Sequence, residues 1–281
     1  MNIKKKFRDI ILRNQFDLMG EKIENKHFNL EWWQGETNLG DSLSPVIFSW
    51  MLDRHHLSDK SDCLRKVHLL STGSLIGAAR FDAVIWGSGI MNAFNLCNLI
   101  KHRKYVKYDI RAVRGPISRD FLLQAGYICP EIYGDPAIIM PLIYKPKSLE
   151  KIYDVTVIKH HLSKDTDKNC KDINYLDIRT TNYKEFIDTI LKSELIISSS
   201  LHGIILAETY GVPAVFLNTG VNDQFIKYMD WYYSTGRTNV KMAKSISEAK
   251  EIKPMEIPDL GSMRQDLINA FPYDLWEKVY E

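Results

Sequence analysis

The sequence predicts an α/β protein built from two doubly wound, Rossmann-like domains that face a central cleft. Short apolar runs alternate with segments of helical period, which is the pattern of parallel-sheet proteins. This pattern occurs twice, and a stretch with prolines and lysines at residues 141–153 separates the two occurrences. A chain of 281 residues is long enough for two domains. We therefore expect an N-terminal domain at residues 1–145 and a C-terminal domain at residues 146–281.

In the first half, the strand candidates are four short apolar runs: Phe28–Trp33, Val67–Ser71, Ala83–Trp86 and Asp109–Val113. Helices are expected to begin near Pro45 and Pro116, because proline suits the first turn of a helix. The residues before the first of these strands are expected to add a further helix or strand.

In the second half, strands are expected at Val155–Lys159, Leu176–Ile178, Leu195–Ser198 and Ala214–Leu217. Helices are expected between and after them, at Tyr183–Lys192, Leu201–Tyr210, Asp223–Tyr232 and Ser245–Ile252. The last segment, Ser262–Ala270 with Trp276 beyond it, has a helical period and is expected to pack back across the first domain. Two such domains place the carboxyl ends of both sheets on a shared cleft, where ligands of these sheets bind.

Composition argues against several classes of protein. The 37 basic residues nearly balance the 35 acidic ones, so we expect no nucleic-acid partner. No run is long and apolar enough for a membrane span. The four cysteines are widely spaced, which favours reduced thiols in a cytoplasmic protein: Cys63, Cys97, Cys129 and Cys170. The basic segment at residues 4–13 fits either a helix that contacts anionic lipid or, as we favour, a helix packed on its domain.

The most informative segment runs from Glu194 to Asn218 and reads as a strand, a serine turn, a helix and a second strand. The turn places Ser199, Ser200, Leu201, His202 and Gly203 at the start of the helix, where unpaired backbone N–H groups favour an anion. His202 could contact that anion and transfer a proton, since imidazole titrates near neutral pH. The alternative is a histidine that only hydrogen-bonds its own loop.

Five segments occur in an order that resembles the polysaccharide pyruvyltransferase family: TNLGDSLSP (37–45), WGSG (86–89), VRGPISRDFL (113–122), YGDPAIIMP (133–141) and SSSLHGIILAETYGVPAVFL (198–217). The resemblance implies a GT-B-like fold. It also implies transfer of the pyruvyl group of phosphoenolpyruvate, as a ketal, to a sugar of a lipid-linked surface-polysaccharide precursor. The acceptor would be a hexose such as galactose, and the reaction would take place in the cytoplasm, with peripheral contact at the inner face of the membrane.

The resemblance assigns donor binding to Arg114, and Arg111 and Arg119 compete for that role. Many members carry an arginine where this chain has Ser200, so one cationic contact is expected to be absent or supplied elsewhere. Glu208 stands where the family is usually apolar, and we interpret it as a residue on the surface of the helix.

Other candidates lie on the loops of the first half. Asn38, Gly40 and Asp41 follow the first strand, and Asp41 either orients or deprotonates the acceptor hydroxyl or caps the next helix. The remaining candidates are Gly87, Ser88 and Gly89, whose backbone could approach a ligand or form a tight turn, and Asp135, which reads more as part of a boundary turn than as a catalytic group.

No cofactor and no obligatory metal are expected. The pairs His55/His56 and His160/His161 suggest metal binding, but adjacent residues rarely face one site. Two alternative functions remain open at this stage. One is a GT-B glycosyltransferase that uses a nucleotide sugar, and the other is a non-catalytic subunit of a capsule assembly complex.

Overall fold

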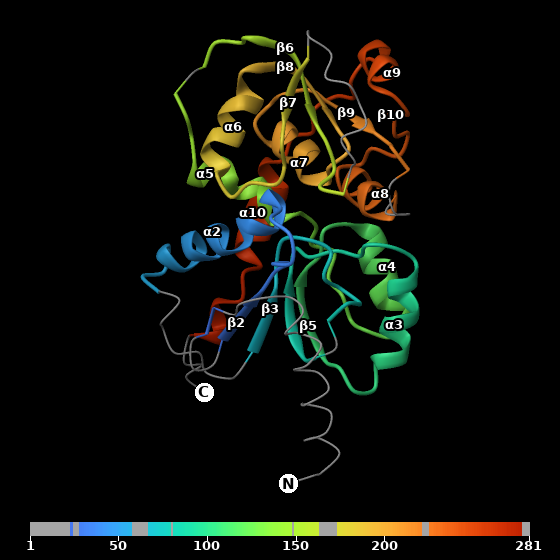
Figure 1. Cartoon of the computed structure of the whole chain (residues 1–281). Helices are drawn as coiled ribbons and strands as arrows, with labels where there is room; N and C mark the ends of the chain where they lie inside the picture. Colours follow the sequence, from blue (N-terminus) through green and yellow to red (C-terminus); the bar gives the residue numbers. More distant parts are fainter. Residues whose placement is uncertain are drawn as a thin grey trace.

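The computed structural model describes residues 23–24, 28–57, 67–79, 81–147, 149–162, 173–220 and 225–276. It contains two five-stranded sheets, one from each half of the chain, with helices packed on them (Figure 1). The prediction of a mixed α/β protein with parallel sheets is confirmed.

The first sheet has the strand order β1-β2-β3-β4-β5. Strands β2 to β5 are parallel, whereas β1 runs antiparallel to β2. The strands are β1 (Ile23–Glu24), β2 (Phe28–Glu31), β3 (Val67–Leu70), β4 (Ala83–Trp86) and β5 (Tyr108–Ala112). The helices of this half are α2 (Leu39–Asp53), α3 (Phe94–His102) and α4 (Pro116–Gln124). The four predicted strands are all present, each within two residues of its expected bounds.

Two predictions for these helices were wrong or incomplete. Helix α2 begins at Leu39 instead of near Pro45, because Asn38 caps it by accepting a 3.0 Å hydrogen bond from the Gly40 N–H. Pro45 therefore lies inside the helix. Helix α3 was not predicted. Its buried residues are only Asn95 and Leu99, so it contributes little to the core.

The second sheet is entirely parallel and has the order β10-β9-β8-β6-β7. Its strands are β6 (Tyr153–Ile158), β7 (Asn174–Leu176), β8 (Ser193–Ser198), β9 (Ala214–Leu217) and β10 (Met242–Ala243). Its helices are α6 (Tyr183–Leu191), α7 (Leu201–Thr209), α8 (Phe225–Ser234) and α9 (Ile246–Glu251). Because β6 lies between β7 and β8, the strand order reverses there, and the loops after β6 and β8 flank the crevice where such sheets bind ligands.

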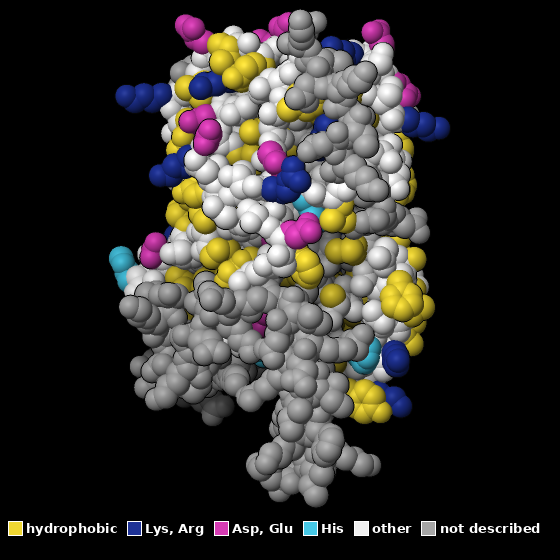
Figure 2. All heavy atoms as spheres, viewed as in Figure 1, with side chains coloured by type: hydrophobic (Ala, Val, Ile, Leu, Met, Phe, Trp, Pro, Cys, Tyr) yellow, Lys and Arg dark blue, Asp and Glu magenta, His cyan; other side chains and the backbone are white. Residues whose placement is uncertain are grey.

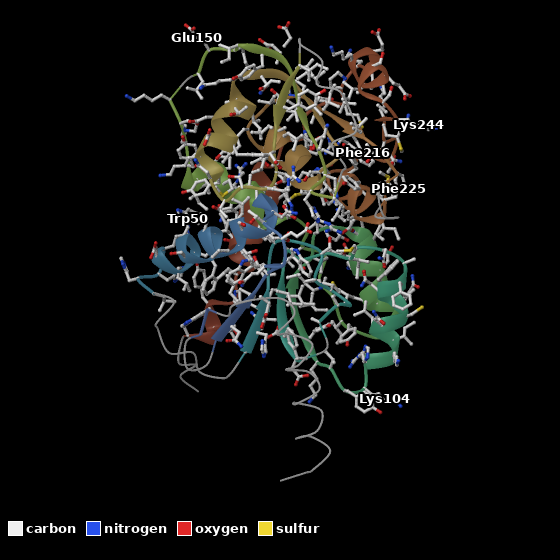
Figure 3. The ribbon with its side chains drawn as sticks, viewed as in Figure 1. Trp50, Lys104, Glu150, Phe216, Phe225 and Lys244 are labelled. Carbon is white, nitrogen blue, oxygen red and sulfur yellow. The ribbon has the colours of Figure 1, made fainter. Side chains whose placement is uncertain are left out.

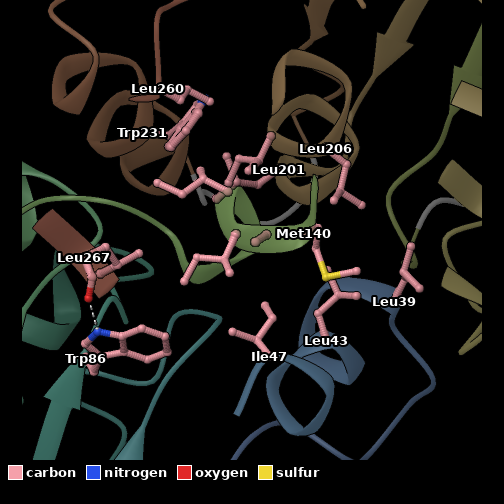
Figure 4. Close-up of a cluster of buried hydrophobic side chains, with 14 of the residues drawn as sticks. Leu39, Leu43, Ile47, Trp86, Met140, Leu201, Leu206, Trp231, Leu260 and Leu267 are labelled. Atoms are coloured by element: carbon pink, nitrogen blue, oxygen red, sulfur yellow. Dashed lines mark hydrogen bonds between the residues drawn. The ribbon is translucent and has the colours of Figure 1, made fainter. Parts of the chain in front are cut away.

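Short helices and the C-terminal segment join the two halves. Helices η1 (Pro136–Ile139) and α5 (Met140–Ile143) lie within the chain that connects the sheets. The last elements, α10 (Gly261–Asn269) and η3 (Tyr273–Leu275), return to the first half (Figure 1). There the indole of Trp86 donates a 2.7 Å hydrogen bond to the carbonyl of Leu267 (Figure 4).

One hydrophobic core extends across the junction of the two halves. Leu39, Leu43 and Ile47 of α2 belong to the same buried cluster as Leu201 and Leu206 of α7 (Figure 4). Helix η1 contacts both of these helices. The cleft between the sheets is therefore closed at one side by apolar packing, which fixes the two halves against each other.

The prediction that Glu208 is a surface residue was wrong. Helix α7 is buried from Leu201 to Glu208, and the Glu208 carboxylate has partners on both oxygens. It accepts a 2.8 Å hydrogen bond from the Trp231 indole and pairs with the guanidinium of Arg237. A helix packed on all sides leaves no solvated face, so its one carboxylate requires fixed partners.

On the face shown in Figure 2, basic and acidic side chains are interspersed. Within the described residues, no helix combines the length and the apolar character needed to cross a bilayer. Cys97 and Cys129 carry free thiols, while Cys63, Cys170 and the basic segment at residues 4–13 lie outside the described residues.

Candidate active site

A cavity of about 270 Å³ lies where the carboxyl ends of the two sheets meet. The first half lines it with residues that follow β2, β3 and β4, and the second half with residues that follow β6 and β8 or lie on α8. Its lining is Trp33, Asn38, Asp41, Gly73, Ser74, Leu75, Ala78, Met91, His160, His161, Ser200, Leu201, His202 and Lys227. This is the expected position for a ligand between two parallel sheets.

The start of α7 forms one wall of the cavity. Ser200 is the N-cap residue in extended conformation, and its side chain makes no capping hydrogen bond. The two preceding serines build the turn instead: Ser198 Oγ accepts from the Ser200 N–H at 3.0 Å, and Ser199 Oγ accepts from the His160 N–H at 2.8 Å. The first-turn N–H groups of α7, which have no intrahelical partner, therefore face a cavity that can accept an anion.

His202 and Asp135 form a buried pair beside this helix start. Nε2 of His202 lies 3.5 Å from Oδ2 of Asp135. The other carboxylate oxygen accepts a 3.0 Å hydrogen bond from the Ala137 N–H, which caps η1. Asp135 therefore caps a short helix and also faces the imidazole. Gly40 lies against the opposite edge of the ring, and a side chain there would collide with Nδ1.

Asp41 presents its carboxylate to the cavity from the first turn of α2, where Asn38 is the cap. Burial raises the pKa of Asp41 from 3.8 to about 6, and the charges of His202 and Lys227 oppose that rise. Gly73 makes room for the carboxylate: its φ is 109°, and a Cβ there would lie 2.7 Å from Oδ1 of Asp41. A pKa of about 6 suits a group that gives and takes protons near neutral pH.

Lys227 of α8 brings a primary amine into the same cavity. Its Nζ lies 3.4 Å from Nε2 of His160, whose Nδ1 accepts a 3.3 Å hydrogen bond from the Leu162 N–H. Burial, with a smaller effect from the charge of Arg114, lowers the pKa of Lys227 to about 7.

The neighbouring His161 also lines the cavity. Its Nδ1 lies 3.3 Å from Nδ2 of Asn38 in the other half of the chain. Burial lowers the pKa of His161, and the charge of Lys227 acts in the same direction. The two adjacent histidines therefore face one site, contrary to the expectation from their spacing.

Arg114 does not line the cavity. Its guanidinium is fully buried and donates to Oδ2 of Asp230 at 3.0 Å, to Oγ of Ser74 at 2.7 Å and to the carbonyl of Ile90 at 2.5 Å. Asp230 lies on α8 and Arg114 follows β5, so this ion pair connects the two halves. The competing Arg111 and Arg119 form ion pairs with Asp109 and Asp274, and with Glu131, respectively.

The other predicted glycine and serine positions serve the packing around the cavity. A side chain at Gly87, where φ is 80°, would collide with Pro136, and one at Gly89 would collide with Arg114. Ser88 Oγ donates to the carbonyl of Gly73 at 3.0 Å. Gly203 packs against the side chain of Ser198.

The structure therefore brings together part of the predicted set. Asn38, Asp41, Ser200, Leu201 and His202 line the cavity, and Gly40 and Asp135 contact His202. The cavity also includes residues that sequence reasoning did not select, chiefly Trp33, Ser74, His160, His161 and Lys227. Histidines directly after a strand were a usable signal, whereas a single lysine within a helix offered none.

Among the described residues, no three His, Cys, Asp or Glu side chains are grouped so that they could hold a metal ion. The fold and the cavity define an α/β protein in which a carboxylate, a lysine and three histidines line one cavity between a largely parallel sheet and a fully parallel one. Residues 53–220 match the polysaccharide pyruvyl transferase family. Because this match spans more than half of the sequence, the chain belongs to that family.

Three known proteins are similar to this chain. An uncharacterized protein of Acanthamoeba polyphaga mimivirus is 24% identical over 230 residues, which are 76% of each chain. The succinoglycan biosynthesis protein ExoV of Rhizobium meliloti is 29% identical over 213 residues, which are 74% of this chain and 64% of that protein. A functionally uncharacterized protein of Klebsiella pneumoniae has a similar fold, with a TM-score of 0.51 and 14% identity over 87% of this chain and 100% of the other.

Proposed function

We propose that this protein transfers the pyruvyl group of phosphoenolpyruvate to two hydroxyls of a sugar in a lipid-linked polysaccharide precursor. The observation that carries the proposal is the convergence of His202 from α7 and Asp41 from α2 on one cavity. Family membership and the similarity to ExoV, a succinoglycan biosynthesis protein, support the pyruvyl group as the group that is transferred and a polysaccharide as its acceptor. The two parallel sheets support a GT-B-like arrangement of two Rossmann-like domains.

The donor's phosphate and carboxylate would bind at the start of α7. Ser200 and the N–H groups of Leu201 and His202 can donate to anionic oxygens there. A carboxylate in such a site repels an anionic donor unless it carries a proton. Because burial already raises the pKa of Asp41 to about 6, a bound polyanion would keep Asp41 protonated.

In the first step, His202 takes a proton from one sugar hydroxyl as its oxygen adds to C2 of the donor. Asp41 gives its proton to C3, so the double bond is consumed and a tetrahedral carbon forms. In the second step, Asp41 takes the proton of the second hydroxyl, whose oxygen bonds to C2. The C2–O bond to phosphate breaks with its electron pair on oxygen, and the phosphate receives the proton from His202.

Asp135 would hold the His202 imidazole in position for both steps. Its carboxylate faces Nε2, so Nδ1 remains the atom that exchanges protons on the side of Gly40 and Asp41. A buried carboxylate also stabilises the imidazolium that forms between the two steps.

The acceptor would enter past Trp33, which lines the cavity and is 37% exposed. An indole at the mouth of a cavity offers an apolar face on which a hexose ring such as that of galactose can stack. A lipid carrier would place the reaction at the cytoplasmic face of the membrane.

The test is an incubation of the purified protein with phosphoenolpyruvate and a lipid-linked oligosaccharide. We expect phosphate release that requires the acceptor, together with an added pyruvyl ketal in the mass spectrum of the sugar. Consumption of a nucleotide sugar in place of phosphoenolpyruvate would reject the proposal in favour of a glycosyltransferase.

A further inference from the structure

Lys227 is the only lysine or arginine among the described residues that line the cavity. Arg114, whose charge acts on Lys227, donates its hydrogen bonds to Asp230, Ser74 and the carbonyl of Ile90. A donor that carries both a phosphate and a carboxylate needs at least one fixed cation in addition to helix N–H groups.

Helix α8 holds Lys227 in a fixed position. On one side, Oη of Tyr228 donates a 2.6 Å hydrogen bond to the carbonyl of Ser199, directly before the start of α7. On the other side, Asp230 accepts from the N–H and Oγ of Ser118 on α4, at 2.9 and 2.6 Å. Because both halves of the chain anchor α8, the ammonium is directed into the cavity between them.

The surroundings of Lys227 are unusual for a lysine. Only 9% of its surface is exposed, and its Nζ faces Nε2 of His160. A buried ammonium is unfavourable unless anionic groups compensate it. The titratable and charged groups around the cavity are Asp41 on α2, His160 and His161 after β6, His202 on α7, Asp135 before η1, and Arg114 with Asp230 behind the lining.

We propose that Lys227 is the cation that binds the anionic donor in this cavity. The inference rests on the proposed function for the identity of the donor, phosphoenolpyruvate. It assigns the cationic role to α8 of the second half, instead of to Arg114 at the end of β5.

A thermodynamic signature follows from the burial of the ammonium. The pKa of Lys227 lies at about 7 without a ligand, since burial and the charge of Arg114 lower it. A polyanion beside the amine favours the charged form and raises that pKa. Donor binding slightly above neutral pH is therefore accompanied by proton uptake at Lys227. Asp41, whose pKa of about 6 a polyanion also raises, contributes a second, separable uptake.

The experiment is calorimetric titration of the full-length protein with phosphoenolpyruvate and, separately, with inorganic phosphate, without acceptor. Measurements at about pH 8 in two buffers of different ionisation enthalpy give the number of protons taken up. Lys227→Met is expected to weaken both ligands by about ten- to a hundredfold and to reduce proton uptake. Lys227→Arg is expected to keep most of the affinity while it also reduces proton uptake, because arginine is always charged.

Lys244→Met is the matched control, since Lys244 is an exposed lysine on the same half of the chain (Figure 3). It should bind both ligands as the wild type does. Thermal unfolding of each variant shows that the fold is retained.

The outcomes separate the inference from the proposed function. Wild-type affinity in Lys227→Met overturns the inference, even if the enzyme forms the ketal. A wild type that binds neither anion also overturns it. If phosphate binding depends on Lys227 but no pyruvyl transfer occurs with any acceptor, the inference stands and the proposed function fails.

Discussion

Oδ2 of Asp135 and Nε2 of His202 face each other at 3.5 Å, and neither atom has a hydrogen-bond partner among the described residues. The distance is that of an ion pair longer than a good hydrogen bond. Such contacts commonly shorten when a ligand completes an active site. The pair connects the loop before η1 with the start of α7. The distance between the two atoms therefore depends on how the two halves of the chain pack against each other.

Asp135→Asn is expected to reduce kcat roughly a hundredfold or more with little change in the melting temperature. Asparagine retains an oxygen that can accept from the Ala137 N–H and cap η1, but it lacks the charge that stabilises a His202 imidazolium. Steady-state kinetics with both substrates and a thermal melt measure the two effects. Wild-type kcat would show that Asp135 only caps the helix.

Asp41→Asn is expected to stabilise the protein by about 1–3 kcal/mol at neutral pH while it abolishes turnover. The folded pKa of Asp41 is raised from 3.8 to about 6, so the native state binds more protons than the unfolded state in that window. Stability therefore falls as pH rises from about 4 to about 6, and the variant lacks this loss. Denaturant unfolding of both proteins across this range measures it. If the free energy of unfolding depended on pH in the same way for the wild type and Asp41→Asn, the prediction would be contradicted.

Gly40→Ala is expected to displace the imidazole of His202 and to reduce kcat strongly, with a cost of about 1–3 kcal/mol in unfolding free energy. The backbone at Gly40 is helical and suits alanine, and the atoms nearest to a Cβ there belong to the imidazole of His202. Gly261→Ala, in α10, serves as the control, because the atom nearest to a Cβ there is Oδ1 of the exposed Asp259, at 3.2 Å. Equal kinetics for Gly40→Ala and the control would be incompatible with this packing.

Arg114→Leu is expected to destabilise the protein by about 3–5 kcal/mol. The substitution leaves Asp230 buried without its charged partner, between the two halves. Arg119→Leu removes a partly exposed ion pair with Glu131 and a 3.1 Å hydrogen bond to the carbonyl of Cys129, and it is expected to cost about 1 kcal/mol. Urea unfolding measures both variants. If Arg114→Leu instead kept full stability and lost only affinity for the donor, the role of Arg114 would be direct binding.

Trp33→Ala is expected to raise the KM for the acceptor about tenfold while the KM for phosphoenolpyruvate stays within a small factor of wild type. The indole lines the cavity and is partly exposed, and Gly35 packs against its ring. Trp33→Phe should retain part of the acceptor affinity, because it keeps an aromatic face. An equal rise in both KM values would indicate a general distortion of the cavity.

Much of the fold followed from local patterns. Parallel strands buried on both faces form short apolar runs, so β4 and β9 were predicted with their observed bounds. The start of α7 was also predicted correctly, because a serine turn after a strand is a local signal. Helix α3, which buries few residues, was not predicted. The start of α2 was misplaced because Asn38 caps the helix, so that Pro45 lies inside it.

The candidate site was only partly predictable. His202 and Asp41 belong to motifs with recognisable spacing, and both line the cavity. Lys227 carries no such signal, since its neighbours in sequence differ from its neighbours in space. Arg114 illustrates the reverse case: its motif suggested a ligand, but its guanidinium is enclosed by Asp230, Ser74 and Ile90.

The sequence by itself determined the two α/β halves, the family and the serine turn before α7, because each depends on residues close together in the chain. Only the tertiary structure decided which charges meet. Asp135 faces His202, and Lys227 reaches the cavity past His160, because helices of one half pack against loops of the other. Burial at that junction, which no local pattern encodes, moves the pKa values of Asp41 and Lys227 toward neutrality.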